Sequence, residues 1–213
     1  MAHRSWARGI SYDFIRWVVR VGAILLFGLR CKGRDRIPPE GAALVCSNHQ
    51  SFLDPVLVGL SFNRRLNYLA RKSLFAFGPF GWLIEFVNAI PIDRDGTSLG
   101  GIKEALRRLK RGEMLLIFPE GTRTPDGEVA PLKPGFLALA RRSRAALLPV
   151  GLDGAFDAWP RHARFPRPMR VHVCIGEPMP PEMVAELDDD QLIEELERRI
   201  RSCCTEARAA RLR

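Results

Sequence analysis

The sequence predicts an α/β domain, and three observations lead to this prediction. Short apolar runs of strand length alternate along the 213-residue chain with segments whose apolar residues recur at helical spacing. Polar stretches that contain glycine and proline separate these segments, as expected of connecting loops. Two of the loops leave the ends of apolar strands, where open α/β sheets place their binding sites. No internal repeat interrupts this order, so we expect residues 37–213 to form one domain.

The chain begins with a basic, aromatic segment, residues 1–36, that we expect to associate with a membrane. It holds eight Lys or Arg against two Asp, and so contributes +6 of the formal net charge of +9. Its uninterrupted apolar run, residues 21–29, is nine residues long, whereas a membrane-spanning helix needs about 20. No small-residue cleavage site follows, so a secretory signal peptide is not predicted. Arginines beside Trp17 and Phe27 favour a helix lying in the membrane interface, and a core-packing helix with solvated arginines is the alternative.

The other elements follow in chain order from periodicity and local breakers. Apolar runs bounded by turn residues predict strands. Ile102, Leu106 and Leu109 recur at helical spacing before Gly112, which predicts a helix that stops there. The predicted strands cover residues 42–47, 66–70, 89–94, 113–118, 146–152 and 170–176, and the predicted helices cover 55–62, 98–112, 136–143 and 188–213.

The C-terminal segment, residues 188–213, predicts a long amphipathic helix. Ile193, Leu196, Ile200 and Cys203 share one face of it, and charged residues cover much of the remainder. The five cysteines of the chain show no CxxC spacing. This pattern indicates free thiols in a reducing compartment.

The first candidate site is NHQSFLDP, residues 48–55, directly after a predicted strand. An imidazole such as that of His49 can accept and return a proton near neutral pH, which suits a general base. Asp54 is predicted to be the N-cap of the next helix, with Pro55 at its first position. A tight turn would bring Asp54 onto the histidine, where a carboxylate fixes the tautomer and stabilises the imidazolium.

Simpler roles for these residues stay open at this point. Asp54 could act as a helix cap alone, and His49 could be a packed or surface histidine. A zinc site is not predicted, because the other three histidines have no ligand spacing with His49 and no cysteine pair is placed to help. Ser51 is not expected to be a nucleophile, since it lacks the GxSxG elbow and its base would lie only two residues away.

The second candidate site is FPEGTR, residues 118–123, directly after another predicted strand. Gly121 allows the backbone to approach a ligand closely. The Arg123 guanidinium offers a planar fork of donors that suits a phosphate or a carboxylate. Glu120 could accept a hydrogen bond from a hydroxyl or hold Arg123 in place. An ordinary turn with a solvated ion pair is the alternative.

Four further cations follow apolar stretches or the long loop, and together they suggest a phosphate pocket: Arg71, Lys72, Arg94 and Lys133. Neither GxxxxGK[ST] nor GxGxxG occurs, so a nucleotide-binding fold is not predicted. The sequence pI of about 9.9 predicts acidic partners. Nucleic acid is not expected, since the N-terminal cations accompany an apolar face and no nucleic-acid-binding motif is present.

The order of four stretches resembles the glycerolipid acyltransferase family, and specifically the bacterial 1-acyl-sn-glycerol-3-phosphate acyltransferases. The stretches are NHQSFLDP, ARKSLFAFGPFGWLIEFVNAIPIDR, FPEGTR and LLPVGLDG, and the resemblance covers about residues 30–175. It implies a mixed β-sheet flanked by helices, with an N-terminal helix at the membrane interface. The last stretch departs from the family pattern, which more usually has a β-branched residue before the proline.

The resemblance also implies site residues. His49 is the expected catalytic base and Asp54 its carboxylate partner in an H-x4-D motif. A second group of residues is expected to bind the acceptor and its phosphate, and consists of Lys72, Arg94, Glu120, Gly121 and Arg123.

The reaction that the resemblance implies is an acyl transfer in phospholipid biosynthesis. A fatty acyl group moves from acyl-CoA or acyl carrier protein to the free hydroxyl of 1-acyl-sn-glycerol-3-phosphate (lysophosphatidate), and phosphatidate forms. Because the thioester is already activated, neither a metal nor a bound cofactor is expected. The expected partner surface is an anionic membrane, at the cytoplasmic face of the inner cell membrane, with the enzyme peripheral or monotopic. Another lyso-lipid, such as a lyso-ornithine lipid, is the alternative acceptor.

Overall fold

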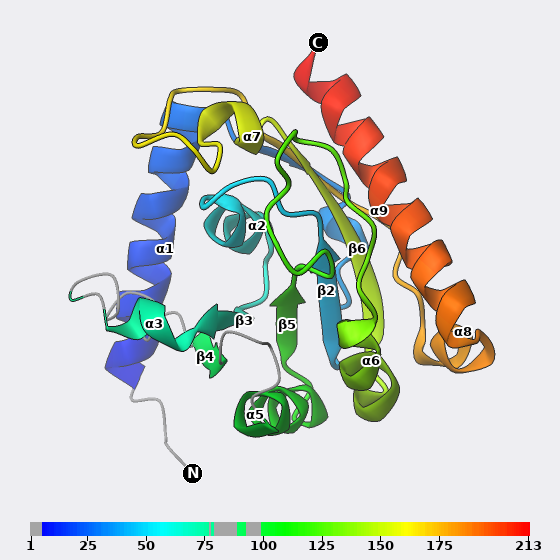
Figure 1. Ribbon diagram of the computed structural model, residues 1–213. Helices are drawn as coiled ribbons and strands as arrows, with labels where there is room; N and C mark the ends of the chain where they lie inside the picture. The colour runs from blue at the N-terminus through cyan, green and yellow to red at the C-terminus, as the bar shows by residue number, and fades with distance from the viewer. Residues whose placement is uncertain (1–5, 77, 79–88, 93–98) are drawn as a thin grey trace.

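A mixed seven-stranded sheet forms the centre of the protein, which a computed structural model describes for residues 6–76, 78, 89–92 and 99–213. The strands are β1 (Arg30–Lys32), β2 (Ala43–Ser47), β3 (Leu66–Arg71), β4 (Ala89–Ile92), β5 (Met114–Ile117), β6 (Ala146–Asp153) and β7 (His172–Ile175). Their order across the sheet is β1-β7-β6-β2-β5-β3-β4 (Figure 1). Neighbouring strands run parallel except β6 and β7, so the predicted mixed sheet is confirmed.

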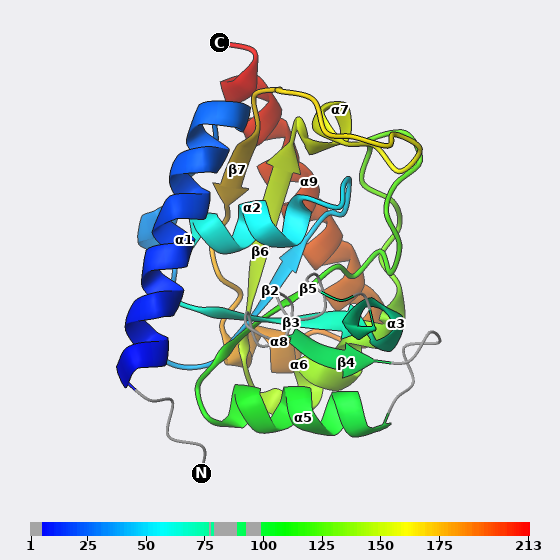
Figure 2. The same ribbon diagram turned by 90° about the vertical axis from the view of Figure 1, so that its left-hand side faces the viewer.

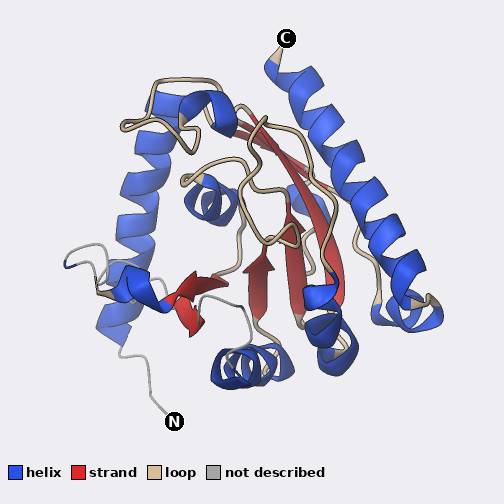
Figure 3. Ribbon diagram, viewed as in Figure 1, coloured by secondary structure: helices blue, strands red, loops and turns tan. Residues whose placement is uncertain are grey.

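Helices cover both faces of the sheet (Figure 3). They are α1 (Trp6–Phe27), α2 (Asp54–Ser61), α3 (Lys72–Phe75), α5 (Leu99–Lys110), α6 (Leu137–Ser143), α7 (Ala155–Ala158), α8 (Pro181–Glu186) and α9 (Asp189–Arg211). Residues of α1, α2 and α7 share one apolar cluster with the sheet, and residues of α5, α6, α8 and α9 share the other. The fold is therefore three layers of helix, sheet and helix.

Strand β2 shows how the sheet separates the two clusters. Ala43 and Val45 belong to the cluster beneath α1 and α2, whereas Leu44 and Cys46 belong to the cluster beneath α9. Successive side chains of a strand point to opposite faces, so a strand covered on both sides must be apolar throughout. This is why the prediction of a buried strand from an uninterrupted apolar run is confirmed here.

One local prediction is wrong, and one strand was not predicted. Asp54 is the first residue of α2 and Leu53 is its N-cap, without a side-chain capping bond. The Asp54 carboxylate turns back to the preceding loop instead, where it finds other donors. Residues 30–32, within the segment 1–36 that the sequence sets apart, form the edge strand β1 against β7. Periodicity does not reveal a three-residue strand made of Arg, Cys and Lys.

The predicted C-terminal helix is confirmed as α9, with a small shift of its buried face. Asp188 is its N-cap and forms a capping box with Gln191. The buried stripe begins at Leu192 instead of the predicted Ile193, which is partly buried, and continues through the predicted Leu196, Ile200 and Cys203.

The N-terminal helix α1 packs on α2 through a capping contact. The Arg16 guanidinium donates to the backbone carbonyls of Gly59 (3.3 Å) and Phe62, at the end of α2. A cation there satisfies terminal carbonyls and favours the negative end of the helix dipole. Among the described helices, none combines the length and the apolar character needed to cross a membrane.

Helix α9 comes closest to the sheet at Gly151 of β6, and Figure 1 shows the helix running along this strand. A Cβ built on Gly151 would lie 2.2 Å from the carbonyl carbon of Cys203 and 2.2 Å from the amide nitrogen of Cys204. Both atoms are backbone, so they cannot move aside as a flexible side chain could. A side chain at residue 151 would push the helix off the strand.

We expect Gly151→Ala to lower the free energy of unfolding by about 2 kcal/mol, because the added methyl overpacks the helix–sheet contact. The matched control is Gly135→Ala, where nothing lies within 4 Å of the added Cβ. Urea unfolding of both variants and the wild type measures the difference. Equal stability of the two variants would contradict the close approach of α9 to β6.

Candidate active site

The candidate site lies at the carboxyl edge of the sheet, where β2 and β5 end side by side. The two strands are parallel, with Cys46 opposite Ile117. His49 follows Cys46 by three residues, and Glu120 follows Ile117 by three residues. The His49 backbone N–H donates to the Glu120 carboxylate at 2.7 Å. Strand register therefore joins the two stretches that the sequence predicts as sites.

A histidine–aspartate pair stands at the centre of this edge. His49 Nδ1 lies 2.7 Å from Asp54 Oδ2, with the Asp54 side chain 0% exposed and the His49 side chain 19% exposed. The same carboxylate oxygen accepts the backbone N–H groups of Gln50 (2.6 Å) and Ser51 (2.7 Å). A buried carboxylate needs such donors, and here they also hold it in line with the imidazole.

Two contacts fix the orientation of the His49 ring. The hydrogen bond to Asp54 assigns the ring proton to Nδ1, which leaves the lone pair on Nε2. Phe118 stacks on the imidazole with 3.9 Å between ring centroids and 15° between ring planes. The aspartate fixes the direction in which Nδ1 points, and the phenylalanine fixes the plane of the ring. The ring is therefore preorganised to take a proton at Nε2.

Two amides on either side of the histidine anchor its loop, and the sequence analysis assigned no role to either. The Asn48 side chain donates to Leu152 O at 2.9 Å and accepts from Leu152 N at 2.8 Å, which ties the loop to β6. The Gln50 side chain donates to Gly127 O at 2.6 Å. The sequence signal was the pair of amide side chains flanking a histidine directly after a buried strand.

Glu120 has the contacts of a residue that joins loops. It is 1% exposed, and its second carboxylate oxygen accepts the Ala130 N–H at 3.1 Å, in addition to the bond from His49. Burial raises the pKa of this carboxyl to about 7, although the two backbone donors oppose the shift. A contact of Glu120 with an acceptor stays a prediction.

Arg123 lies on an aromatic platform beside the site. Its guanidinium carbon stands 3.4 Å from the centroid of the Phe52 ring. Phe52 in turn contacts Trp159, with 5.4 Å between ring centroids and an interplanar angle of 48°. Stacking on an aromatic face holds a guanidinium without using all of its donors. The predicted anion-binding arginine is thus placed next to the histidine stretch.

Gly121 and Lys133 lie together on the same loop. Gly121 has φ +72°, a conformation that favours glycine, and its backbone is exposed. A Cβ built there would lie 3.2 Å from Lys133 Cδ and 3.4 Å from Lys133 Nζ. The lysine side chain therefore crosses over the glycine, which adds a second cation to the loop of Arg123.

Lys72 and Arg94 are the other two cations predicted to bind the acceptor phosphate. Lys72 is exposed and begins α3 directly after β3. Because β3 runs parallel to β5, this residue lies at the same carboxyl edge as the histidine, on the far side of β5 from β2. Arg94 lies outside the described residues, so its predicted place in the site stays a prediction.

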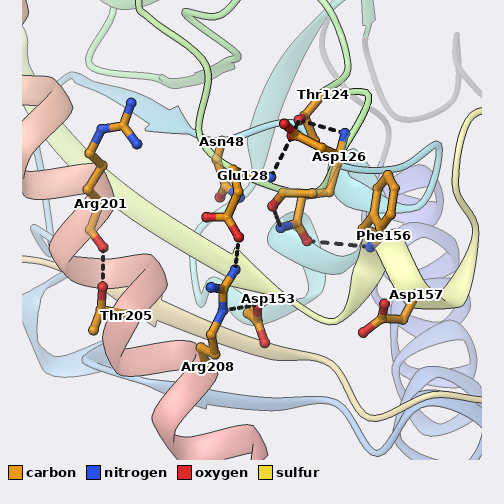
Figure 4. Close-up of polar contacts among 12 residues, drawn as sticks. Asn48, Thr124, Asp126, Glu128, Asp153, Phe156, Asp157, Arg201, Thr205 and Arg208 are labelled. Carbon is orange, nitrogen blue, oxygen red and sulfur yellow. Dashed lines mark hydrogen bonds and ion pairs between the residues drawn. The ribbon is translucent and has the colours of Figure 1, made fainter.

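Helix α9 fastens the loop that follows β5. Arg208 donates to Glu128 at 2.8 Å and to Asp153, at the end of β6, at 3.2 Å (Figure 4). Glu197 accepts the Leu132 backbone N–H at 3.2 Å. The described part of the chain holds no group of three or more His, Cys, Asp or Glu side chains arranged to bind a metal ion.

The fold and this geometry define an α/β enzyme with a histidine–aspartate pair beside a cationic loop. A family model described as Acyltransferase matches residues 28–153. The chain therefore belongs to the acyltransferase family, and the predicted resemblance to glycerolipid acyltransferases is confirmed.

Named acyltransferases from bacteria are similar to this chain. A 1-acyl-sn-glycerol-3-phosphate acyltransferase of Pseudomonas aeruginosa is 30% identical over 97% of this chain and 76% of the relative. Another, from Bacillus subtilis, is 27% identical over 79% of this chain and 82% of the relative. The crystal structure of the 1-acyl-sn-glycerophosphate acyltransferase PlsC from Thermotoga maritima superposes with a TM-score of 0.84 at 27% identity, over 98% of this chain and 84% of that one.

The raised pKa of Glu120 predicts a pH-dependent stability. In the folded chain the pKa is about 7, and its ordinary value is 4.5. Between these values the folded state binds more protons than the unfolded state, so the free energy of unfolding falls as the pH rises. We expect Glu120→Gln, which has no proton to lose, to lack this fall. Urea unfolding at several pH values across the window compares the two proteins, and parallel profiles would contradict the raised pKa.

Proposed function

We propose that the protein is a 1-acyl-sn-glycerol-3-phosphate O-acyltransferase that converts lysophosphatidate and an acyl thioester into phosphatidate. The observation that carries this proposal is the oriented His49–Asp54 pair beside the stacked Arg123. The names of the relatives from Bacillus subtilis and Pseudomonas aeruginosa support the choice of acceptor.

In the proposed reaction His49 acts as the general base. Its Nε2 removes the proton of the free hydroxyl of lysophosphatidate while the oxygen attacks the thioester carbonyl. Asp54 stabilises the imidazolium that forms, because its buried carboxylate already lies 2.7 Å from Nδ1. The tetrahedral intermediate then expels the thiolate, which takes the proton from the imidazolium and leaves as the thiol. Backbone N–H groups of the surrounding loops would stabilise the oxyanion.

The cations at this edge would bind the acceptor phosphate. Arg123 presents a planar fork of donors, and Lys133 adds a point charge over Gly121. Lys72 and Arg94 complete the proposed group from the second motif. Because the aromatic platform holds the guanidinium before the ligand arrives, little side-chain entropy would be lost on binding.

The donor and the location belong to the same proposal. The acyl donor is acyl-CoA or acyl carrier protein, and its activated thioester lets the reaction proceed without a bound cofactor. The enzyme would rest on the anionic cytoplasmic face of the inner cell membrane through α1, whose outer face carries the exposed Trp17 and Leu25. Its acceptor and its product are both lipids of that membrane.

Loss of the base should nearly abolish turnover. We expect His49→Ala to reduce phosphatidate formation from lysophosphatidate and acyl-CoA by about 100- to 10,000-fold, the usual contribution of a general base. Purified full-length protein in detergent is assayed, with circular dichroism to show that the variant is folded. Equal turnover of the wild type and the variant would contradict the role of His49 as general base. Absence of turnover in both would direct the assay to acyl carrier protein as donor and then to another lyso-lipid.

An Arg123 variant tests whether the acceptor carries a phosphate. We expect Arg123→Ala to lower kcat/KM for lysophosphatidate by about 10- to 100-fold, mainly through KM, because a charge-assisted hydrogen bond is lost. Arg142→Ala, an exposed arginine on α6, is the matched control. An unchanged KM for lysophosphatidate in Arg123→Ala would contradict phosphate binding. It would favour an acceptor that lacks a phosphate, such as a lyso-ornithine lipid.

A further inference from the structure

Exposed large apolar side chains gather on one side of the described chain. They lie on the outer face of α1, at the start of α2, and on the loop of residues 159–170 that joins α7 to β7. On this loop Phe165 is 76% exposed and Met169 is 36% exposed. Leu212, near the C-terminus, is the only other exposed large apolar side chain among the described residues. Such a concentration of apolar surface marks an interaction site.

The three segments adjoin one another. The Val171 N–H donates to Phe27 O at 2.8 Å, which joins the end of the loop to the end of α1. At the other end of the loop, Trp159 contacts Phe52, just before α2. In Figure 1 the loop lies on the side of the sheet where α1 and α2 lie, and in Figure 2 it crosses the top of the molecule toward α7. The apolar side chains of the loop therefore extend the surface that α1 begins.

The charge of the loop selects an anionic partner. Residues 161–170 read RHARFPRPMR, with four arginines and no acidic residue. All four arginines are exposed, and none of them forms an ion pair with another described residue. They are Arg161, Arg164, Arg167 and Arg170. On α9, by contrast, Arg198 pairs with Glu195 and Arg201 pairs with Glu197. The loop keeps its positive charge available.

The loop is also held in shape. The Arg167 N–H donates to Ala158 O at 2.7 Å, and the Trp159 indole N–H donates to Ala163 O at 3.0 Å. Prolines at 166 and 168 restrict the backbone on either side of Arg167. These contacts close the loop so that Phe165 stands at an exposed turn, and little backbone entropy would be lost when the turn binds.

We propose that residues 161–170 form a second membrane-binding element, separate from α1. Phe165 and Met169 enter the interface of an anionic bilayer while the neighbouring arginines bind lipid phosphates. A bilayer fits better than nucleic acid, because the apolar side chains continue onto the apolar face of α1. The inference rests on the proposed membrane partner and deepens it. With α1 and the loop both on the bilayer, Phe52 and Arg123 lie at the lipid surface between them.

Sedimentation with lipid vesicles tests the loop directly. The full chain is mixed with phosphatidylcholine vesicles that contain or lack phosphatidylglycerol. We expect Arg164→Gln with Arg167→Gln to weaken partitioning to the anionic vesicles about fivefold for each arginine removed. Phe165→Ala should weaken it about tenfold. The matched controls lie elsewhere on the surface: Lys110→Gln with Arg142→Gln for charge, and Leu212→Ala for apolar area.

The outcomes separate this inference from the proposed function. Loop variants that sediment like wild type would overturn the loop element while leaving α1 as the membrane contact. If the wild-type protein does not bind anionic vesicles, both the loop element and the membrane contact of α1 are overturned. If the arginine variant loses binding while Phe165→Ala binds like wild type, the loop is a general polyanion site. That outcome would also overturn the inference. No substrate is present, so failure of the proposed acyl transfer does not affect the result.

Discussion

The parallel pairing of β2 with β5 is the constraint on which the site depends. Both strands are buried on both faces, so a register shift would move each side chain into the wrong apolar cluster and leave backbone groups unpaired at the strand ends. The register sets the position of the two loops that leave these strands. It places the His49 backbone N–H within hydrogen-bond distance of the Glu120 carboxylate. The pairing of these two strands therefore brings the His49 loop and the cationic loop together.

The buried Asp54 then decides what the loop can do. A carboxylate that is 0% exposed loses its water, and the backbone N–H groups of Gln50 and Ser51 replace part of that solvation. The loop can supply these donors only when it turns tightly around the carboxylate, and that turn points the His49 imidazole at the same oxygen. One buried group thus shapes the loop and orients the histidine. Amides at positions 48 and 50 hold the turn from outside by bonds to distant segments.

Local patterns in the sequence predicted the parts of the structure that local physics controls. The apolar runs of the central strands and the amphipathic residues 188–213 could be assigned because burial imposes a period on them. The closeness of His49 and Asp54 was predictable because five residues separate them. The partners of Asn48 and Gln50 lie 104 and 77 residues away, and no periodicity reports contacts of that range. Strand β1 escaped prediction because an edge strand can be polar.

Phe52 links the chemistry to the surface on which it would take place. A phenylalanine that is 50% exposed leaves apolar area in water, which is unfavourable in an isolated protein. Its ring nevertheless supports Arg123 on one side and contacts Trp159 on the other. On the proposed membrane, a lipid headgroup layer would cover the apolar ring and supply a phosphate to the guanidinium in the same step. In that proposal the Phe52 ring would join the lipid surface to the loop that carries His49.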